Sequence, residues 1–315
     1  MIFVTGGAGF IGSQFVREWI ARKLGPVIVF DKLTYAGNPD NLSSVASHPD
    51  YSFVRGDICD PAAVSEALPE HCDALIHFAA ESHVDRSISS AAEFVRTNVL
   101  GTQVLLDVAR ARKTRRFLHI STDEVGGSIP EPRFFRESDS LHPSSPYAAS
   151  KAAAEHLVHA AHHTFGIDTL ITRTSNNYGP FQYPEKLLPL AITRALAGEP
   201  IPVYGDGMQV RDWIHVADNC AALRLILERG EPGATYHIGG GNVLPNLEVL
   251  RTLLRVLELP ESLLTPVTDR LGHDRRYAVD WSRIRDELGW RPRVPFAEGL
   301  AATAAWYRAK AISRG

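Results

Sequence analysis

The segment VTGGAGFIG, residues 4–12, constrains the fold more than any other part of the chain. It follows the apolar run 2–4 and opens the amphipathic stretch 11–23, and its last three glycines have the G-x-G-x-x-G spacing. Glycine at those positions permits a tight turn, close approach of backbone N–H groups to a pyrophosphate and close helix–strand packing. The positive end of the following helix also favours an anion. The segment therefore predicts a strand–turn–helix unit that binds a dinucleotide.

Short runs of β-forming residues alternate with amphipathic segments, which is the pattern of βαβ units and a parallel sheet. We expect strands at 2–5, 27–30, 52–55, 74–78, 117–121 and 170–174. We expect helices at 11–23, 62–68, 98–112 and 147–164. The predicted fold class is α/β, a Rossmann-type doubly wound parallel sheet with a smaller C-terminal substrate-binding lobe.

The alternation loosens after about residue 175, where several prolines interrupt the segments. Residues 1–175 are therefore expected to form the dinucleotide-binding domain. A further helix at 216–228 and a strand at 236–238 indicate that residues 212–238 return to that domain. Residues 176–211 and 239–315 are expected to form the lobe.

Composition excludes several classes of function. The net charge is −3 and no run of Lys or Arg exceeds two residues, so neither nucleic acid nor a membrane surface is an expected partner. The three cysteines lack CxxC spacing, which argues against a disulfide framework or a zinc site. No apolar stretch is long enough to span a membrane, and the first residues already read as a strand rather than a signal peptide. We expect a soluble, cytoplasmic protein.

The end of the second predicted strand indicates which dinucleotide binds. Asp31 stands there, 19 residues beyond Gly12. A carboxylate at this point accepts hydrogen bonds from ribose hydroxyls and repels a 2′-phosphate, which favours NAD over NADP. Asp57 and Ile58 follow the third strand, where they can bind the adenine edge or form a plain turn.

Tyr147 and Lys151 are four residues apart on a predicted helix, so their side chains share one face. An ammonium group beside a phenol stabilises the phenolate, as does a positively charged nicotinamide. Both effects are expected to lower the pKa of the Tyr147 phenol toward neutrality. The pair would then serve as a base for a sugar hydroxyl.

Two adjacent acids, Asp123 and Glu124, follow the buried strand 117–121 and Thr122. In a closed pocket two neighbouring carboxylates titrate apart, because both cannot ionise cheaply. Such a pair suits chemistry that needs one acid and one base close together. The alternative is a solvated acidic loop.

From the first strand to about Trp306 the chain resembles the dTDP-glucose 4,6-dehydratases, which are extended short-chain dehydrogenase/reductases. The matching stretches are TGGAGFIGS (5–13), DKLTYAGN (31–38), HFAAESHVDRS (77–87), STDEV (121–125), SPYAASKA (145–152), NNYGPFQYPEKLLPL (176–190), YGDGMQVRDWIHV (204–216), YHIGGGN (236–242) and GHDRRY (272–277). Agreement this long is highly specific.

The resemblance implies an internal redox dehydration of a nucleotide-activated hexose. Tyr147 would take the proton of the sugar 4-hydroxyl as hydride leaves C4 for NAD, and Thr122 would hydrogen-bond the 4-oxygen. Glu124 would remove the proton from C5 and Asp123 would protonate the departing 6-hydroxyl. Hydride would then return to C6. Epimerases and reductases of the superfamily need only the Ser/Thr–Tyr–Lys set, so the Asp-Glu pair distinguishes a dehydratase from them.

The resemblance also implies binding residues. Those expected to bind NAD are Gly6, Gly9, Phe10, Ile11, Gly12, Asp31, Lys32, Thr34, Gly37, Asp57, Ile58, Ala79, Ala80, Ser82, Tyr147 and Lys151. Those expected to bind the sugar and its nucleotide are His83, Asp85, Asn177, Glu185, Lys186, Leu187, Arg211, Asn246 and His273, with weaker indications for Arg276 and Tyr277. Helices 98–112 and 147–164 would pair across a homodimer.

The chain departs from the family at Gly126, where the family usually has tyrosine in STDEVYG. Three interpretations remain open: an altered sugar pocket, a partly disabled enzyme, or a tolerated change in which a neighbour fills the space. Three other hypotheses compete for the function: a nucleotide-sugar 4-epimerase or decarboxylase, a dehydratase of another NDP-sugar, and a non-catalytic NAD-sensing protein. His156, His159 and His163 share a helix face, but no acid follows in HExxH order, so no metal site is predicted.

Overall fold

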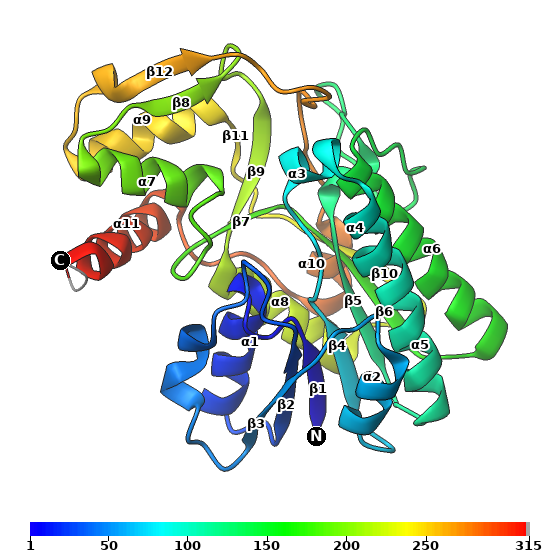
Figure 1. Cartoon of the computed structure of the whole chain (residues 1–315). Coiled ribbons are helices and arrows are strands. Elements are labelled where there is room, and N and C mark those ends of the chain that lie inside the picture. Colours follow the sequence, from blue (N-terminus) through cyan, green and yellow to red (C-terminus); the bar gives the residue numbers. More distant parts are fainter. Residues whose placement is uncertain (313–315) are drawn as a thin grey trace.

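A seven-stranded parallel sheet forms the centre of the larger part of the molecule (Figure 1). The structure is a computed structural model and describes residues 1–312. The strands are β1 (Ile2–Thr5), β2 (Val27–Asp31), β3 (Tyr51–Arg55), β4 (Ala74–His77), β5 (Phe117–Thr122), β6 (Thr169–Thr174) and β10 (Thr235–Ile238). Their order is β10-β6-β5-β4-β1-β2-β3, which confirms the predicted doubly wound fold. β10 pairs with β6, so this later part of the chain returns to the sheet.

Helices cover both faces of the sheet. One face packs against α1 (Phe10–Ala21), α8 (Val216–Arg229) and α10 (Ser282–Leu288), and the other against α2 (Pro61–Ala67), α5 (Gly101–Ala111) and α6 (Pro146–Phe165). Alternation along β1 decides the faces: Ile2 and Val4 enter the first core, whereas Phe3 enters the second. Fully burying side chains of this size stabilises the fold by about 1.5–3 kcal/mol each. We call this layered body the sheet domain.

Local signals explain where α6, the helix that carries Tyr147 and Lys151, begins. Ser145 caps α6, its side chain accepting a hydrogen bond from the Ala148 N–H, and Pro146 occupies the first helical position. The segment predicted as helix 98–112 begins with a π-helical stretch, η2 (Val95–Leu100), before α5. It is preceded by the short helices α3 (Val84–Ser89) and α4 (Ala92–Phe94).

The remaining elements build a lobe with a core of its own (Figure 1). Two small sheets belong to it, β11-β9-β7 and β12-β8. Their strands are β7 (Asn176–Tyr178), β8 (Ile201–Tyr204), β9 (Val210–His215), β11 (Val243–Pro245) and β12 (Leu264–Val267). The helices are α7 (Leu187–Ala197), α9 (Asn246–Leu257) and α11 (Phe296–Ile312), and the short turns η1 (Pro39–Val45), η3 (Asp123–Gly126) and η4 (Glu261–Leu263) complete the fold.

The structure divides the C-terminal region differently from the expectation, which assigned all of 239–315 to the lobe. Ile284, Leu288 and Trp290 are buried in the core of the sheet domain, because α10 packs beside α8 and β10. α9 and α11 do pack in the lobe core. Among residues 1–312, no helix combines the length and the apolar character needed to cross a membrane.

Candidate active site

One cavity of about 350 Å³ opens at the carboxyl ends of β1, β2, β4 and β5. β1 and β4 are neighbours there although they are not consecutive in the chain, which is the usual ligand position in such sheets. The cavity is lined by every residue predicted to bind NAD and by all five predicted catalytic residues. They are Gly6, Gly9, Phe10, Ile11, Gly12, Asp31, Lys32, Thr34, Gly37, Asp57, Ile58, Ala79, Ala80, Ser82, Thr122, Asp123, Glu124, Tyr147 and Lys151.

The backbone of the glycine loop packs so tightly that side chains would not fit at Gly6 or Gly12. A loop without side chains lets a dinucleotide approach the backbone closely. A Cβ on Gly12 would lie 2.4 Å from the carbonyl oxygen of Gly6, and one on Gly6 would lie 2.5 Å from the Ala79 nitrogen. Gly6 also has φ +68°, a conformation that favours glycine. The loop leads directly into the N-terminus of α1, where backbone N–H groups are available to a pyrophosphate.

Asp31 ends β2 and lines the cavity beside this loop. Its carboxylate accepts hydrogen bonds from the N–H groups of Leu33 at 2.8 Å and Ala8 at 3.0 Å. Burial nevertheless raises its pKa, and these two hydrogen bonds oppose the shift. Beyond it, Lys32 Nζ pairs with Asp57 at 2.8 Å, so the predicted adenine end of the cavity is held by an ion pair.

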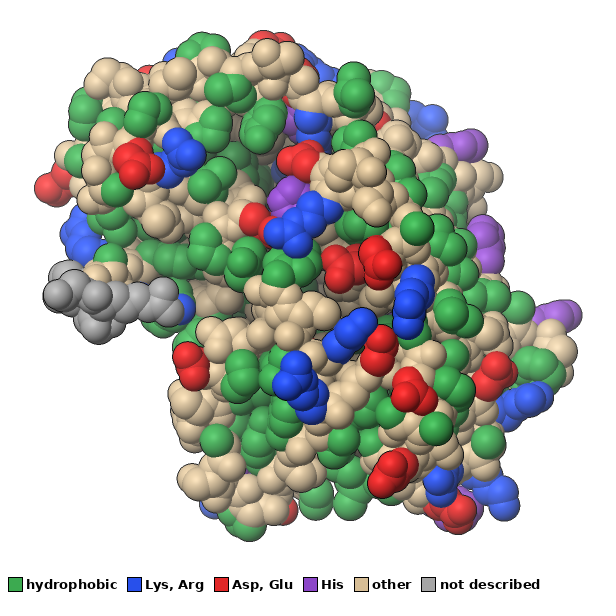
Figure 2. Space-filling model, in the orientation of Figure 1, with side chains coloured by type: hydrophobic (Ala, Val, Ile, Leu, Met, Phe, Trp, Pro, Cys, Tyr) green, Lys and Arg blue, Asp and Glu red, His purple; other side chains and the backbone are tan. Residues whose placement is uncertain are grey.

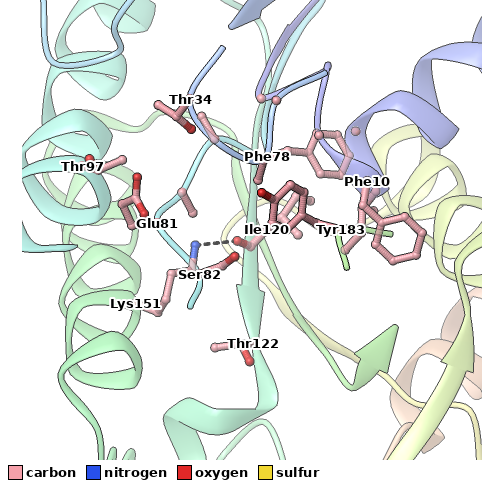
Figure 3. A pocket seen from close by; sticks show the side chains of 18 of the residues that line it. Phe10, Thr34, Phe78, Glu81, Ser82, Thr97, Ile120, Thr122, Lys151 and Tyr183 are labelled. Atoms are coloured by element: carbon pink, nitrogen blue, oxygen red, sulfur yellow. Dashed lines mark hydrogen bonds between the residues drawn. The ribbon is translucent and has the colours of Figure 1, made fainter. Parts of the chain in front are cut away.

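Lys151 is buried and its Nζ donates a hydrogen bond to the carbonyl oxygen of Ile120 at 2.7 Å, the dashed line in Figure 3. Burial lowers its pKa to about 8, and Glu155 opposes that shift. Thr122 lies further along β5 in the same view. The amine thus lines the cavity beside β5, two residues before the end of the strand that leads into the acids.

The predicted lowering of the Tyr147 pKa is wrong for the chain alone. Burial, followed by the charge of Glu124, raises the pKa of the phenol above its ordinary value. The reason is that the phenol is buried with the Glu124 carboxylate beside it, while the Lys151 ammonium is hydrogen-bonded to the strand. Activation of Tyr147 therefore requires additional positive charge in the cavity.

The two acids begin the short turn η3 directly after β5. The Thr122 hydroxyl donates to Asp123 Oδ1 at 3.2 Å and accepts from the Glu124 N–H at 3.3 Å. Burial and the charge of Glu124 raise the pKa of Asp123 to about 8. Its second oxygen, Oδ2, is buried without a hydrogen-bond partner. Asp123 is therefore protonated near neutrality and can act as an acid.

Burial also raises the pKa of Glu124, but three cations oppose the shift: Arg211, Arg270 and Lys186. All three come from the lobe or from the segment that leads into it. Figure 2 shows charged side chains of both signs gathered in the hollow between the lobe and the sheet domain. The cations favour the ionised form of Glu124, so the two carboxylates are driven apart in the direction that an acid and a base require.

Each cation has a defined attachment. Arg211 is buried above the Tyr277 ring at 4.2 Å, and its guanidinium donates to the carbonyl oxygens of Val210 and Asp274. Lys186 Nζ donates to the Ser82 carbonyl oxygen at 2.8 Å. Arg270 pairs with Asp85 at 3.4 Å, a contact from the lobe to α3. The sequence analysis missed Arg270, which lies just before GHDRRY and carries no spacing signal of its own.

The predicted substrate residues divide into two groups. Asn177, Glu185 and Lys186 line the cavity, and Asn177 Oδ1 is buried there without a partner. The others lie around it rather than in its lining: His83, Asp85, Leu187, Arg211, Asn246 and His273. Of these, His83 caps α3, Leu187 begins α7, Asn246 begins α9 and His273 pairs with Asp269.

Of the two weaker candidates, Tyr277 lies under Arg211, whereas Arg276 points elsewhere and donates to the carbonyl oxygens of Ile129 and Arg133. Sequence reasoning also missed several lining residues, among them Glu81, Glu93, Thr97, Ser121, Gln182 and Tyr183. Figure 3 shows Glu81 and Thr97 near each other on one side of the cavity.

Phe135 occupies the space beside Gly126. A Cβ on Gly126 would meet the Phe135 ring at 2.6 Å, and that ring is buried and stacked on His237 with centroids 5.0 Å apart. Gly126 itself does not line the cavity. The structure thus favours the third interpretation of the missing tyrosine, a change accommodated by a neighbouring ring.

The histidine stripe on α6 does not converge on one point. His159 contacts the Thr235 hydroxyl at 3.5 Å, whereas His156 and His163 are exposed. A glycine cradle, a Tyr–Lys pair on one helix and an added lobe define instead an NAD(P)-dependent short-chain dehydrogenase/reductase of the extended type. The acid pair narrows this class to sugar dehydratases.

Comparison with known proteins identifies the family. The sequence model of the GDP-mannose 4,6 dehydratase family matches residues 3–303. A dTDP-glucose 4,6-dehydratase of Streptomyces niveus is 53% identical over 312 residues, 98% of this chain and 92% of the relative. One of Xanthomonas campestris is 50% identical over 323 residues, 96% of this chain and 92% of the relative. The chain therefore belongs to the dTDP-glucose 4,6-dehydratase family.

Solved structures agree with this placement. A dTDP-glucose 4,6-dehydratase of Streptomyces venezuelae, with NAD and TYD bound, matches with a TM-score of 0.95 and 50% identity over 98% of this chain and 97% of that one. A UDP-glucose 4-epimerase of Thermotoga maritima, with UDP-glucose, reaches a TM-score of 0.90 at 29% identity over 98% and 99%. Both activities use this fold, so the residues of the site must distinguish them.

Proposed function

We propose that the chain dehydrates dTDP-glucose to dTDP-4-keto-6-deoxyglucose with NAD as its cofactor. The observation that carries the proposal is the acid pair with opposed electrostatic environments, placed in one cavity with Tyr147, Lys151 and the glycine cradle. An epimerase has no use for a protonated Asp123 next to an ionised Glu124. Half of the residues are also shared with dehydratases over nearly the whole chain.

The sheet domain binds the cofactor. Backbone N–H groups of the glycine loop hold the pyrophosphate, Asp31 accepts from ribose hydroxyls, and Asp57 with Ile58 borders the adenine. When bound, NAD would supply the hydride acceptor for C4 and, once reduced, the hydride donor for C6. Its positive ring also supplies the charge that Tyr147 lacks in the chain alone.

Tyr147 acts first. Its phenolate takes the proton of the sugar 4-hydroxyl, and the Lys151 ammonium stabilises the phenolate. The Thr122 hydroxyl at the end of β5 turns from Asp123 Oδ1 when the sugar binds and donates its hydrogen bond to the 4-oxygen. The ketone that results at C4 acidifies the proton on C5.

Glu124 and Asp123 complete the dehydration. Glu124, whose ionised form the three cations favour against the effect of burial, removes the C5 proton. Asp123, whose pKa of about 8 keeps it protonated, gives its proton to the 6-hydroxyl as water leaves. The double bond between C5 and C6 would then accept hydride at C6 and, at C5, the proton that Glu124 had removed. The proton that Tyr147 took from the 4-hydroxyl would return to Asp123, so the net change is the loss of one water.

The lobe binds the nucleotide. Arg211 and Arg270 suit the diphosphate, because a guanidinium offers several donors in a planar fork. Asn177 and the pair Glu185–Lys186 face the sugar from the cavity wall. The remaining contacts proposed from the resemblance are His83, Asp85, Leu187, Asn246 and His273.

Two broader proposals accompany this function. α5 and α6 are proposed to pair in a homodimer, supported by Val95 and Leu100, which are about half exposed on the adjoining η2. A cytoplasmic location is supported by the three cysteines, which are all free thiols.

The test is to incubate the purified chain with dTDP-glucose, with and without added NAD, and to follow the mass of the nucleotide sugar. The proposal requires loss of one water with no net formation of NADH. An unchanged mass with a new isomer would establish an epimerase instead. An unchanged sugar would be followed by a panel of UDP- and GDP-hexoses, and dehydration of one of these would assign a different NDP-sugar.

A further inference from the structure

A row of polar side chains crosses the sheet beneath the cavity, at a level where a core is otherwise apolar. Thr5 on β1 is the register partner of His77 on β4, which in turn is the partner of His119 on β5. All three are buried on the face covered by α5 and α6. The mechanism above uses none of them.

His77 is fully engaged within this row. Its Nδ1 lies 2.8 Å from the Thr5 hydroxyl and its Nε2 lies 3.1 Å from the hydroxyl of Thr102 on α5. Its ring centroid is 5.2 Å from that of His119. His77 can therefore be explained as a satisfied core residue.

His119 is different. Its Nε2 faces Lys151 Nζ at 3.4 Å, while its Nδ1 is buried and has no hydrogen-bond partner. A buried unpaired polar group costs about 1–3 kcal/mol, a cost that a phenylalanine or leucine in the same place would avoid. The imidazole is thus poorly explained by stability, and its one polar contact is with the lysine of the site.

The contact between Lys151 Nζ and His119 Nε2 determines which of the two groups carries the shared proton. An ammonium can only donate, so Nε2 of His119 must present its lone pair and the ring proton resides on Nδ1. Burial, and then the charge of Lys151, lowers the pKa of His119 well below its ordinary value, so the ring is neutral. Two of the three Lys151 protons are then committed, to Ile120 O and to His119, and the third is left for the cavity.

We propose that His119 is a positioning residue for Lys151, its neutral imidazole holding the ammonium in the orientation and charge state that Tyr147 requires. This inference rests on the proposed function. A hydrogen bond to the charged form of an amine favours that form, so His119 offsets part of the burial that disfavours the Lys151 ammonium. The other charged or titratable groups near the two are Glu155 and His159 on α6 and His77 on β4.

The prediction concerns the alkaline side of the pH profile, where the Lys151 ammonium is lost. His119→Phe keeps a planar ring but removes the acceptor, so the ammonium should be lost at lower pH. We expect the alkaline limb of kcat for dTDP-glucose to move down by about one pH unit, which lowers kcat about fivefold at pH 8. His119→Gln places an amide oxygen near the position of Nε2. It should restore kcat to within about threefold of the wild-type value and return the alkaline limb toward its wild-type position.

The matched control is His77→Phe, which removes an equally buried imidazole from the neighbouring register position without touching the Lys151 hydrogen bond. It should lower the thermal midpoint while leaving the alkaline limb in place. NAD affinity, titrated at pH 7 and pH 9, gives a readout besides activity. His119→Phe should weaken it more at pH 9, and His77→Phe equally at both.

The proposal would be overturned if His119→Phe lowered kcat by the same factor at every pH. It would also be overturned if His77→Phe moved the alkaline limb as far as His119→Phe does. Should His119→Phe fail to fold, His119→Asn replaces it, since its shorter amide falls short of Lys151. Equal profiles for the Gln and Asn variants would then contradict the proposal. Failure of the proposed function is separate, because it would show as a wild-type chain that does not dehydrate dTDP-glucose.

Discussion

The sheet domain and the lobe contribute to the same cavity in different ways. The sheet domain supplies its groups from short contiguous segments: the glycine loop after β1, the turn after β5 and one face of α6. The lobe side supplies Lys186, Arg211 and Arg270, which come from three distant segments and act together on Glu124. The residues for cofactor binding and for oxidation of the sugar thus come from short local segments. The cations that set the charge of Glu124 for the loss of water are brought together by tertiary packing.

The two adjacent acids express the same difference. Asp123 is held by Thr122 within the sheet domain, and burial keeps it protonated. Glu124 is partly buried, and the cations from the lobe side draw it toward the ionised form. Neighbours in sequence therefore acquire opposite roles through contacts with different parts of the molecule.

Glu124→Gln should separate the two halves of the reaction and have the largest effect. Without the base, we expect dehydration to slow by about 10²–10⁴-fold, the usual contribution of general base catalysis. Oxidation at C4 should persist, visible as a stable 340 nm absorbance when substrate is added. Exchange of the C5 proton in D₂O, followed by NMR, measures the missing step directly.

Asp31→Ala is the matched control for this separation, since it alters only the cofactor side. It should weaken NAD binding and leave C5 exchange intact at saturating NAD. If Glu124→Gln dehydrates at the wild-type rate, another group is the C5 base.

Substitutions at Gly126 and Phe135 can test whether the Phe135 ring fills the space beside Gly126 in the turn that carries the acids. Phe135→Ala should destabilise the fold by about 3–5 kcal/mol, the usual cost of a large cavity. Gly126→Tyr should cost about 1–3 kcal/mol through overpacking against the Phe135 ring. The double variant should be more stable than the sum predicts, by about 1–3 kcal/mol in a denaturant-unfolding cycle. Additive effects would show that the two sites do not share space.

Arg270→Gln tests the contribution of the lobe. The cation lowers the Glu124 pKa, so its removal should raise that pKa and move the acidic limb of kcat to higher pH. We expect about a tenfold loss at pH 6 and a smaller loss at pH 8. Arg275→Gln is the control, because Arg275 lies on the same loop but is exposed and paired with Asp206. An unmoved limb would remove Arg270 from the electrostatics of the site.

Asp123→Asn should give the smallest effect on stability, and with an unusual sign. The folded-state pKa of about 8 lies above the unfolded value of 3.8, so the native state binds the extra proton between those limits. The wild type therefore loses stability as pH rises from about 4 through about 8, and the variant does not. Relative to wild type, the midpoint of Asp123→Asn should rise by about 2–4 °C between pH 5 and pH 8.5. A pH-independent difference would contradict the raised pKa.

The same contrast explains what could be predicted from sequence. The seven parallel strands were confirmed because each follows from a local pattern, a short run of β-forming residues beside an amphipathic segment. The residues predicted from the glycine spacing line one cavity for the same reason. Arg270 could not be predicted, because its role depends on a loop that reaches from the lobe to Asp85. Packing of α10 against the sheet domain was likewise missed, since nothing local distinguishes it from the lobe helices.

One error of chemistry and one open interpretation have a physical cause as well. The Tyr147 pKa was predicted low from its distance to Lys151 along a helix, but spacing does not reveal how deeply a phenol is buried or which carboxylates face it. Gly126 left several interpretations open, because the ring beside it belongs to Phe135, nine residues further along the chain.

One experiment tests the contributions of the sheet domain and the lobe together: conversion of dTDP-glucose that carries deuterium at C4. We predict a product that has lost one water and retains the deuterium at C6, in a reaction run in unlabelled water without added NADH. Such a result requires oxidation by the sheet domain and loss of water at the acid pair within a single binding event. A dehydrated product without the label, or a labelled product with its water retained, would contradict the assignment of this cavity.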